Sequence, residues 1–430
     1  MSAMAEQVRF TEAYPEIGDG PIPTEPYFSE EYFKQEQKYV FGRAWIHLGR
    51  VEEIPNPGDY FVKDLEAPKA SVLVVRDKDG QVRAFHNVCT HRCNRLVINS
   101  CGKGARRFNC TFHGWSFDTQ GKLAGVPEKD TFTKFDQSEL GLTPVACDTW
   151  EGFIFVCFAD PPQESLEDFL GDHFAQLKGY PFHRLQACFG WQAVVKCNWK
   201  VALDAFQEAY HVPYVHGHSI ADALRGATEG PPFRPLTAVL NGYHRKLSIG
   251  GNPKSVYGNP KAVTEGAAPA MDNPTKPIES AALRLGRGGT KERFEASDLP
   301  RGMNPSKHPN WAFDINGVFP DFYLSLRPNY YQAYNFRPLS ADETLFDARV
   351  YYPKQENAGG RFYQEYMKNV LRDVLLEDWA TLERLYDAMK SGARKTMVYS
   401  ENEIALRHSF HVIDGFVQRK GAPPTREGRV

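Results

Sequence analysis

Two short groups of cysteine and histidine lie close together in the first third of the chain. They are Cys89-Thr90-His91 and Cys110-Thr111-Phe112-His113. Two thiolates and two imidazoles can hold one zinc ion in a tetrahedral site. The same four side chains can hold a two-iron cluster, in which the neutral imidazoles raise the reduction potential. The spacing of the ligands alone leaves zinc and iron–sulfur open.

A second pair of histidines, His211 and His216, follows Glu208 in a segment predicted to be largely helical. Taken alone the pair is weak evidence, because a single helical histidine is more often a core residue than a ligand, and the nearby His218 could be mistaken for one. With a carboxylate, two histidines complete a facial triad that leaves positions on iron(II) open for oxygen. The pair therefore predicts a metal site if a suitable carboxylate lies elsewhere in the chain.

The best candidate for that carboxylate is Asp378, in a helix predicted over residues 362–389. It falls within a buried stripe of 3.6-residue period, whereas Asp373, Glu377 and Arg384 fall on the opposite face, which we expect to be solvated. A buried carboxylate is costly unless it is paired or bound to a metal. Pairing with a buried arginine or capping of a loop is the alternative, and the two histidines favour ligation. The apolar members of the stripe are Met367, Leu371, Val374, Leu375, Leu382, Leu385 and Met389.

Strands are expected to position the first group of ligands. Residues 72–75 and 82–85 are apolar runs joined by Asp77-Lys78-Asp79-Gly80, which is a hairpin signal. Residues 250–310 are rich in Gly and Pro, and such a long loop inside a compact domain is usually functional or mobile, so we expect a lid there. The other expected elements are a short helix near 30–39, strands at 152–158 and 191–195, a helix at 200–211, and strands at 322–326, 330–336 and 345–352.

The composition is that of an ordinary globular protein. Of 430 residues, 42% are hydrophobic and 24% charged, and the net charge of -2 gives no electrostatic case for a nucleic-acid or anionic-membrane partner. No apolar run approaches the roughly 20 residues that span a bilayer. The polar segment 1–20 lacks the features of a secretory signal, so we expect a cytoplasmic protein. In that reducing compartment, clustered cysteines favour a metal site over disulfides.

The residues after the second ligand group separate the two metal types. Gly114-Trp115-Ser116-Phe117-Asp118 continues to Gly121, and the whole stretch from Cys110 resembles the second Rieske loop of ring-hydroxylating oxygenases. The chain is similar to the large (α) subunits of Rieske non-haem iron oxygenases from about residue 40 to 390. One departure is Cys93, where the family commonly has glycine. We expect Cys93 and Cys101 to be free buried thiols rather than a disulfide.

The resemblance implies an α+β fold, a Rieske iron–sulfur β-domain followed by a START-like helix-grip catalytic domain. The implied organisation is an N-terminal arm and helix at 1–40, the Rieske domain at 41–165, the catalytic domain at 166–415 and a flexible tail at 416–430. Cys89, His91, Cys110 and His113 would hold the [2Fe–2S] cluster, and His211, His216 and Asp378 the mononuclear Fe(II), with O2 as co-substrate.

Two further acidic residues gain implied roles from the resemblance. Glu208 matches the residue that bridges the cluster of one subunit to the iron of its neighbour, although many relatives have Asp there. Asp204 lies where relatives often have Asn near the iron, which leaves its role open. The inter-subunit bridge implies a homotrimer, with or without a small β subunit. No nucleotide-binding fingerprint is present, so the electrons are expected from a ferredoxin and an NAD(P)H-dependent reductase.

The expected function is that of the terminal oxygenase component, which hydroxylates an aromatic or other hydrophobic small molecule. Oxidative N- or O-dealkylation of such a molecule is the alternative within the family, and the motifs do not separate the two. A more distant alternative is a carrier of hydrophobic ligands with a structural zinc. The colour and EPR signal of a reduced cluster would distinguish the enzyme from the carrier.

Overall fold

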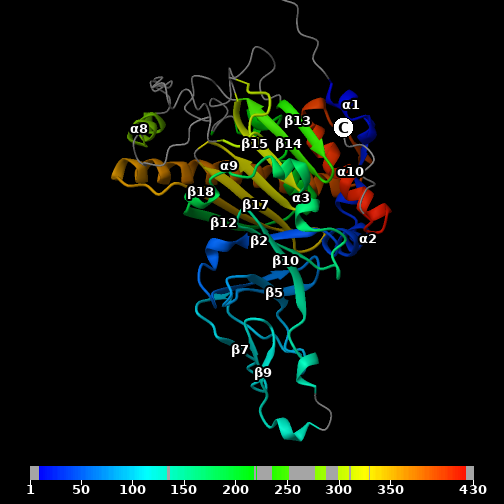
Figure 1. Ribbon diagram of the computed structural model, residues 1–430. Helices are drawn as coiled ribbons and strands as arrows, with labels where there is room; N and C mark the ends of the chain where they lie inside the picture. Colours follow the sequence, from blue (N-terminus) through cyan, green and yellow to red (C-terminus); the bar gives the residue numbers. More distant parts are fainter. Residues whose placement is uncertain are drawn as a thin grey trace, which may run out of the picture. The chain divides into compact units, whose positions relative to one another are not determined.

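The computed structural model describes residues 9–132, 136–216, 219, 235–250, 277–286, 299–308, 311–328 and 330–422. The chain forms two compact units, coloured by sequence in Figure 1. Unit 1 comprises Met1–Lys34 and Leu170–Val430, and unit 2 comprises Gln35–Phe169. The residues of the expected arm up to Lys34 therefore belong with the C-terminal part of the chain. Helices and strands occur together, as the predicted α+β class requires.

Unit 2 is built from two antiparallel sheets. The larger sheet has the strand order β2-β11-β10-β5-β4-β3-β6, and the smaller one has the order β7-β8-β9. The predicted hairpin is confirmed as β4 and β5, and the predicted strand at 152–158 as β11. The bounds are β2 Trp45–Arg50, β3 Tyr60–Leu65, β4 Ala70–Arg76, β5 Val82–His86, β6 Cys101–Gly102, β7 Arg107–Asn109, β8 Ser116–Asp118, β9 Leu123–Gly125, β10 Pro144–Trp150 and β11 Phe153–Cys157.

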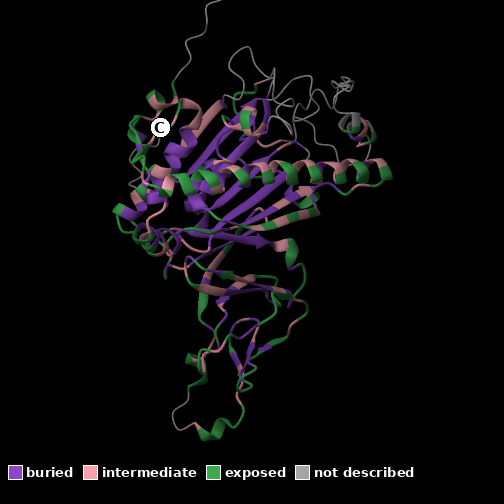
Figure 2. Cartoon of the chain, turned by 180° about the vertical axis from the view of Figure 1, so that it is seen from behind, coloured by how far each residue is buried: buried purple, intermediate pink, exposed green. Residues whose placement is uncertain are grey.

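Unit 1 is organised around one seven-stranded antiparallel sheet. Its order is β12-β18-β17-β16-β15-β14-β13, and the register sets Tyr323 opposite Tyr334 and Ser325 opposite Gln332. Every residue of β16 and β17 is buried, as Figure 2 shows for the centre of the sheet. The bounds are β12 Ala187–Val195, β13 Pro235–Asn241, β14 His244–Gly250, β15 Trp311–Val318, β16 Phe322–Leu326, β17 Tyr331–Pro338 and β18 Thr344–Tyr352.

The long helix α9, Ala358–Lys390, lies along the central sheet (Figure 1). It begins at Asn357, whose side chain accepts a hydrogen bond of 2.8 Å from the amide of Gly360. Its outer face is exposed along its length in Figure 2. Asp378 lies on the buried face, as predicted, together with Met367, Leu375 and Leu382. Leu385 was expected in the stripe but is 44% exposed, because Trp379 and Tyr386 fill the buried positions in that region.

The shorter helices of unit 1 differ from the prediction at one informative place. The helix expected over 200–211 ends at Asp204, and a second short helix starts at Val212. The connection between them carries Glu208 and His211, so their side chains are set by a turn rather than by a regular helix. The helix bounds are α1 Phe10–Ala13, α2 Glu30–Glu36, α3 Leu166–Ala175, α4 Trp199–Asp204, α5 Val212–Val215, α8 Pro277–Gly286 and α10 Ile404–Gln418.

The arm and the end of the chain are tied to unit 1. Strand β1, Ile22–Pro23, pairs with β19, Thr396–Met397. Helix α10 continues to Gln418, so residues 416–418 belong to this helix and not to the predicted tail. Within the predicted lid the structure describes only α8 and residues 299–308, and His218 also lies outside the described residues. No helix in the described ranges is both long and apolar enough to cross a membrane.

Candidate metal centres

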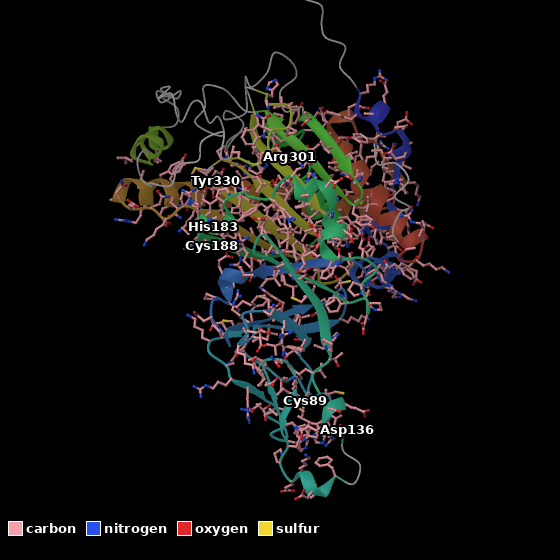
Figure 3. All side chains as sticks on the ribbon, viewed as in Figure 1. Cys89, Asp136, His183, Cys188, Arg301 and Tyr330 are labelled. Carbon is pink, nitrogen blue, oxygen red and sulfur yellow. The ribbon has the colours of Figure 1, made fainter. Side chains whose placement is uncertain are left out.

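The two Cys/His groups lie on loops that follow β5 and β7 of unit 2. Figure 3 labels Cys89, which lies at the end of the unit that carries β7 and β9. Each loop folds back four residues after its cysteine, since the amide of Cys93 donates to the carbonyl of Cys89 (3.0 Å) and that of Gly114 to Cys110 (3.0 Å). Both Cys93 and Gly114 have a left-handed backbone, with φ of 56° and 75°. Glycine adopts this conformation freely, whereas Cys93 adopts it with a side chain in place.

Among the four side chains, the two cysteines and the two histidines differ in exposure. Cys89 and Cys110 are buried in the hydrophobic core, whereas His91 is partly exposed and His113 is exposed. The two imidazole rings lie 4.6 Å apart, and the buried Trp115 stacks on His91 at 4.7 Å. The two cysteine side chains contact each other. This arrangement fits a two-iron cluster with thiolates on the inner iron and imidazoles on the outer one.

The zinc alternative requires the four donors to converge on one ion. Among the residues that the structure describes, the only set of three such side chains with all donor atoms within 4.8 Å is His211, His216 and Asp378. No three of the four loop ligands meet that condition, so the geometry favours the cluster. Cys93 and Cys101 are free thiols, as predicted, but both are exposed rather than buried.

The second centre brings His211, His216 and Asp378 together in unit 1. The Nε2 atom of His216 lies 3.0 Å from Oδ1 of Asp378, and that of His211 lies 3.6 Å from the same oxygen. The two Nε2 atoms are 3.2 Å apart. Three donors that face one another in this way present one face of ligands to a metal and leave its other positions open. The structure therefore assembles the three residues that the sequence proposed as a triad.

Each histidine of the triad is held from behind by a carboxylate. Nδ1 of His211 pairs with Glu208, and Nδ1 of His216 pairs with Oε2 of Glu377 at 2.7 Å. A carboxylate that accepts from Nδ1 of a ligand imidazole fixes its tautomer and leaves Nε2 available to the metal. The placement of Glu377 corrects the prediction of a solvated side chain, since it is 28% exposed and also accepts a hydrogen bond from Ser219. Its position next to Asp378 was the available signal.

The electrostatics of the triad favour a bound cation. Burial lowers the pKa of His211, but Glu208 and Asp378 outweigh it and the pKa is raised overall. The same holds for His216, where Asp378 and Glu377 raise the pKa against the effect of burial. Carboxylates that favour a proton on these rings also favour a divalent metal there. The residues present thus fit a mononuclear metal site.

Asp204 lies apart from the triad. Its Oδ2 accepts hydrogen bonds from the hydroxyl of Tyr27 on the arm (3.0 Å) and from that of Tyr399 (3.4 Å). Burial raises the pKa of Asp204 to about 7, although the hydrogen bond from Tyr27 and the charge of Arg245 act in the opposite direction. Asp204 does not line the cavity beside the triad, so its contacts assign it to the buried connection between the arm and α4.

A cavity of about 150 Å³ opens beside the triad. One wall is the buried face of α9, and the other is the face of the central sheet. Aromatic side chains line part of the cavity, where Phe206 packs against Tyr323 and Tyr334 at 5.9 and 5.7 Å. The α9 wall is aliphatic, with Met367, Val370, Leu371, Val374 and Leu375. The space beside the metal ligands is thus suited to an apolar molecule.

A Rieske-type two-metal architecture therefore defines the class of this protein. Residues 44–136 match the Rieske [2Fe-2S] domain, and residues 182–418 match the ring hydroxylating alpha subunit (catalytic domain). The chain belongs to this family of oxygenase alpha subunits. Membership implies a [2Fe–2S] cluster, a mononuclear iron and O2, as predicted, and the predicted fold class is confirmed.

Named relatives are oxygenase components. The biphenyl 2,3-dioxygenase subunit alpha of Rhodococcus jostii (strain RHA1) is 31% identical over 331 residues, which is 69% of either chain. The large oxygenase component of the naphthalene 1,2-dioxygenase system of Pseudomonas putida is 38% identical over 217 residues. That match covers 47% of either protein, so the chain spans about half the length of the naphthalene dioxygenase component.

Two solved structures share the fold. A quaternary ammonium Rieske monooxygenase superposes with a TM-score of 0.69 at 20% identity, over 96% of this chain and 99% of that one. Naphthalene 1,2-dioxygenase from Rhodococcus sp., bound to indole, gives 0.68 at 21% identity, over 98% of both. At these identities the likeness concerns the fold alone.

Proposed function

We propose that the chain is the terminal oxygenase component of a multicomponent Rieske oxygenase that hydroxylates an aromatic or other hydrophobic small molecule. The observation that carries the proposal is the triad of His211, His216 and Asp378 at the end of an apolar cavity. When bound there, iron supplies the redox chemistry that activates O2. The other functions of the site fall to the side chains of the chain itself.

Those side chains position the metal ligands and keep water out of the cavity. Glu208 and Glu377 hold the two imidazoles so that both Nε2 atoms point to the same place. Phe206 and the aliphatic face of α9 exclude water from the space where the substrate binds. The buried carboxylate of Glu208 has a second proposed role, as the link through which electrons reach His211 from the neighbouring subunit.

Exposed aromatic and aliphatic side chains support a head-to-tail ring of subunits. Phe112 and Ile98, on the surface beside the cluster loops, are 55% and 68% exposed. Beside His211, Tyr210 and Tyr214 are 48% and 79% exposed. Two different apolar surfaces on one chain suit a heterologous interface, which closes into a ring such as a trimer. The proposed partners are a ferredoxin and an NAD(P)H-dependent reductase, and the proposed location is the cytoplasm.

Two other functions are less well supported. A carrier would gain nothing from placing three metal-binding donors at the end of its apolar cavity, because buried polar groups are costly. Oxidative N- or O-dealkylation uses the same metal centre, and a product screen separates it from ring hydroxylation by the release of aldehyde.

The test is a visible and EPR spectrum of the anaerobically purified protein, followed by turnover with a surrogate ferredoxin and reductase. We expect the EPR signal of a reduced Rieske cluster and iron in both centres. A colourless, zinc-loaded protein without that signal would exclude the proposal. An aromatic panel with naphthalene and biphenyl provides the first substrates, with diol, phenol and aldehyde measured separately.

A further inference from the structure

A cationic side chain, that of Arg327, lines the cavity at the candidate iron centre. Nη1 of Arg327 donates to Oγ of Ser325 (2.7 Å) and to Oε1 of Gln332 (3.0 Å), and both of these partners are neutral. The guanidinium carbon lies 4.2 Å from the ring centre of Phe313 and 4.8 Å from that of Tyr330. In the part of the chain that the structure describes, no carboxylate lies within ion-pair distance of Arg327. The aromatic rings and the two hydrogen bonds fix the plane of the guanidinium group but do not neutralise its charge.

A buried lysine of the same sheet does face a carboxylate. Nζ of Lys246 lies 3.7 Å from Oδ2 of Asp314, and both side chains are buried. An uncompensated charge away from bulk water is costly, so a fold rarely retains one without a partner. Arg327 is partly exposed, and it is a cavity-lining residue, so that a partner can come from the molecule that fills the cavity.

Arg327 lines the same cavity as the metal ligands. Its hydrogen bond to Ser325 sets the guanidinium beside that residue, which follows Tyr323 by two residues, or about 7 Å at the rise of a strand. Tyr323 and Tyr334 lie within the electrostatic range of both Arg327 and Asp378. On the opposite wall, Met367 precedes Asp378 by eleven residues, or about 16 Å along a helix. The cavity wall formed by α9 thus extends well beyond the triad.

Stacked rings connect Arg327 to the Met367 end of α9. Tyr330, labelled in Figure 3, stacks on Tyr352 at 4.7 Å, and Tyr352 stacks on Phe189 at 5.5 Å. Lys368, which follows Met367, places its ammonium 4.9 Å from the ring centre of Phe189. The cation, the metal ligands and the aliphatic face of α9 therefore line one cavity.

We infer that the substrate is an elongated, mainly apolar molecule that carries an oxyanion, a carboxylate or a sulfonate, at the end held by Arg327. The opposite end of the molecule is then the one presented to the metal centre. This inference rests on the proposed function and names the class of its substrate. The preset plane of the guanidinium suits a bidentate contact with such a group.

The test compares ligands that differ only in charge. Biphenyl-4-carboxylate, biphenyl-4-sulfonate and the neutral biphenyl-4-carboxamide are titrated calorimetrically into the anaerobic, full-length protein. We expect at least one of the two anions to bind about 10- to 100-fold more tightly than the carboxamide, the range for hydrogen bonds to charged groups. The two anions, compared with each other, identify which oxyanion the site prefers.

Two variants locate the source of the preference. Arg327→Gln should reduce the anion-to-carboxamide ratio to about one. Lys368→Gln removes a cation from the same end of α9 that does not line the cavity, and it should leave the ratio unchanged. Because each ratio is measured within one variant, partial loss of folded protein does not imitate the effect. Arg327→Lys should keep part of the preference, since the charge remains and the fork is lost.

The inference fails if the wild type shows no preference for either anion, or if the preference persists in Arg327→Gln. It also fails if Lys368→Gln abolishes the preference, because the field of the whole surface would then be responsible. These measurements need no turnover. A protein with a normal Rieske EPR signal that ignores the anions would refute this inference and leave the proposed function intact, whereas a missing cluster would refute the function itself.

Discussion

Replacement of Asp204 by asparagine should change how the stability of the protein depends on pH. Asp204 is buried and accepts hydrogen bonds from Tyr27 and Tyr399, which an asparagine oxygen can also accept. Burial raises the pKa of Asp204 to about 7. The folded protein therefore retains this proton up to about pH 7, whereas the unfolded chain releases it near its ordinary value of about 4.

The sign and size follow from proton linkage. Between about pH 4 and about pH 7 the folded state binds more protons than the unfolded state, so the free energy of unfolding falls as the pH rises. At about 1.4 kcal/mol per pKa unit, the whole interval corresponds to about 4 kcal/mol. About half of this, or about 2 kcal/mol, falls between pH 5.5 and pH 8. Asp204→Asn removes this slope, so the variant gains on the wild type as the pH rises.

The assay is urea unfolding of both proteins at several pH values in that window, monitored by tryptophan fluorescence. The difference in unfolding free energy is then plotted against pH. Asp342→Asn is a matched control, because Asp342 also accepts a hydrogen bond from a tyrosine, Tyr386 at 2.5 Å, but is 51% exposed. Solvent screens an exposed charge, so the control difference should vary little with pH.

A difference between wild type and Asp204→Asn that stays flat from about pH 5.5 to about pH 8 would refute the reasoning. It would mean that Asp204 is ionised throughout, with Arg245 as its counter-ion. If the wild type instead gains on the variant as the pH rises, the ionised carboxylate stabilises the fold. Burial would then not be the dominant influence on the pKa of Asp204.

Three further predictions concern the metal centre. Asp378→Ala should empty the mononuclear site and spare the cluster, and full iron occupancy there, by metal analysis and EPR, would contradict the ligand assignment. Glu377→Gln should weaken iron binding about 10- to 100-fold in chelator competition, the usual cost of losing the carboxylate that holds a ligand histidine. Glu383→Gln, on the same helix but hydrogen-bonded to the amide of Lys196, should not weaken it. Glu208→Gln changes the equivalent carboxylate behind His211 and should weaken iron binding to a similar extent; when loaded with iron it should still lack coupled turnover, and unchanged turnover would show that electrons take another path.

Periodicity was sufficient to find Asp378 but not its neighbour Glu377. A helical stripe separates a core face from an outer face, and it assigned Glu377 to the outer one. The segment around His216 and Ser219 covers that side of α9 and supplies the partners of Glu377. Such coverage depends on contacts between residues more than 150 positions apart, which no local pattern contains.

Local patterns predicted the strands better than the short helices. The hairpin of β4 and β5 and the strand β16 lie where alternating or apolar runs placed them. The helix expected over 200–211 stops at Asp204, because the turn after it is fixed by the pairing of Glu208 with His211. The pairing of Ile22–Pro23 with Thr396–Met397 joins opposite ends of the sequence and leaves no signal in either segment.

The two walls of the cavity contribute unequally to the metal site. All three metal-binding side chains come from α9 and the segment after α4, and none comes from the central sheet. A substitution on α9 that reshapes the cavity near Met367 can shift the helix and thereby displace Asp378. A change at Phe313, Ile315 or Gln332 on the sheet alters no metal ligand. The sheet is therefore the wall on which substrate range can diverge, or be engineered, while the catalytic metal geometry is inherited unchanged.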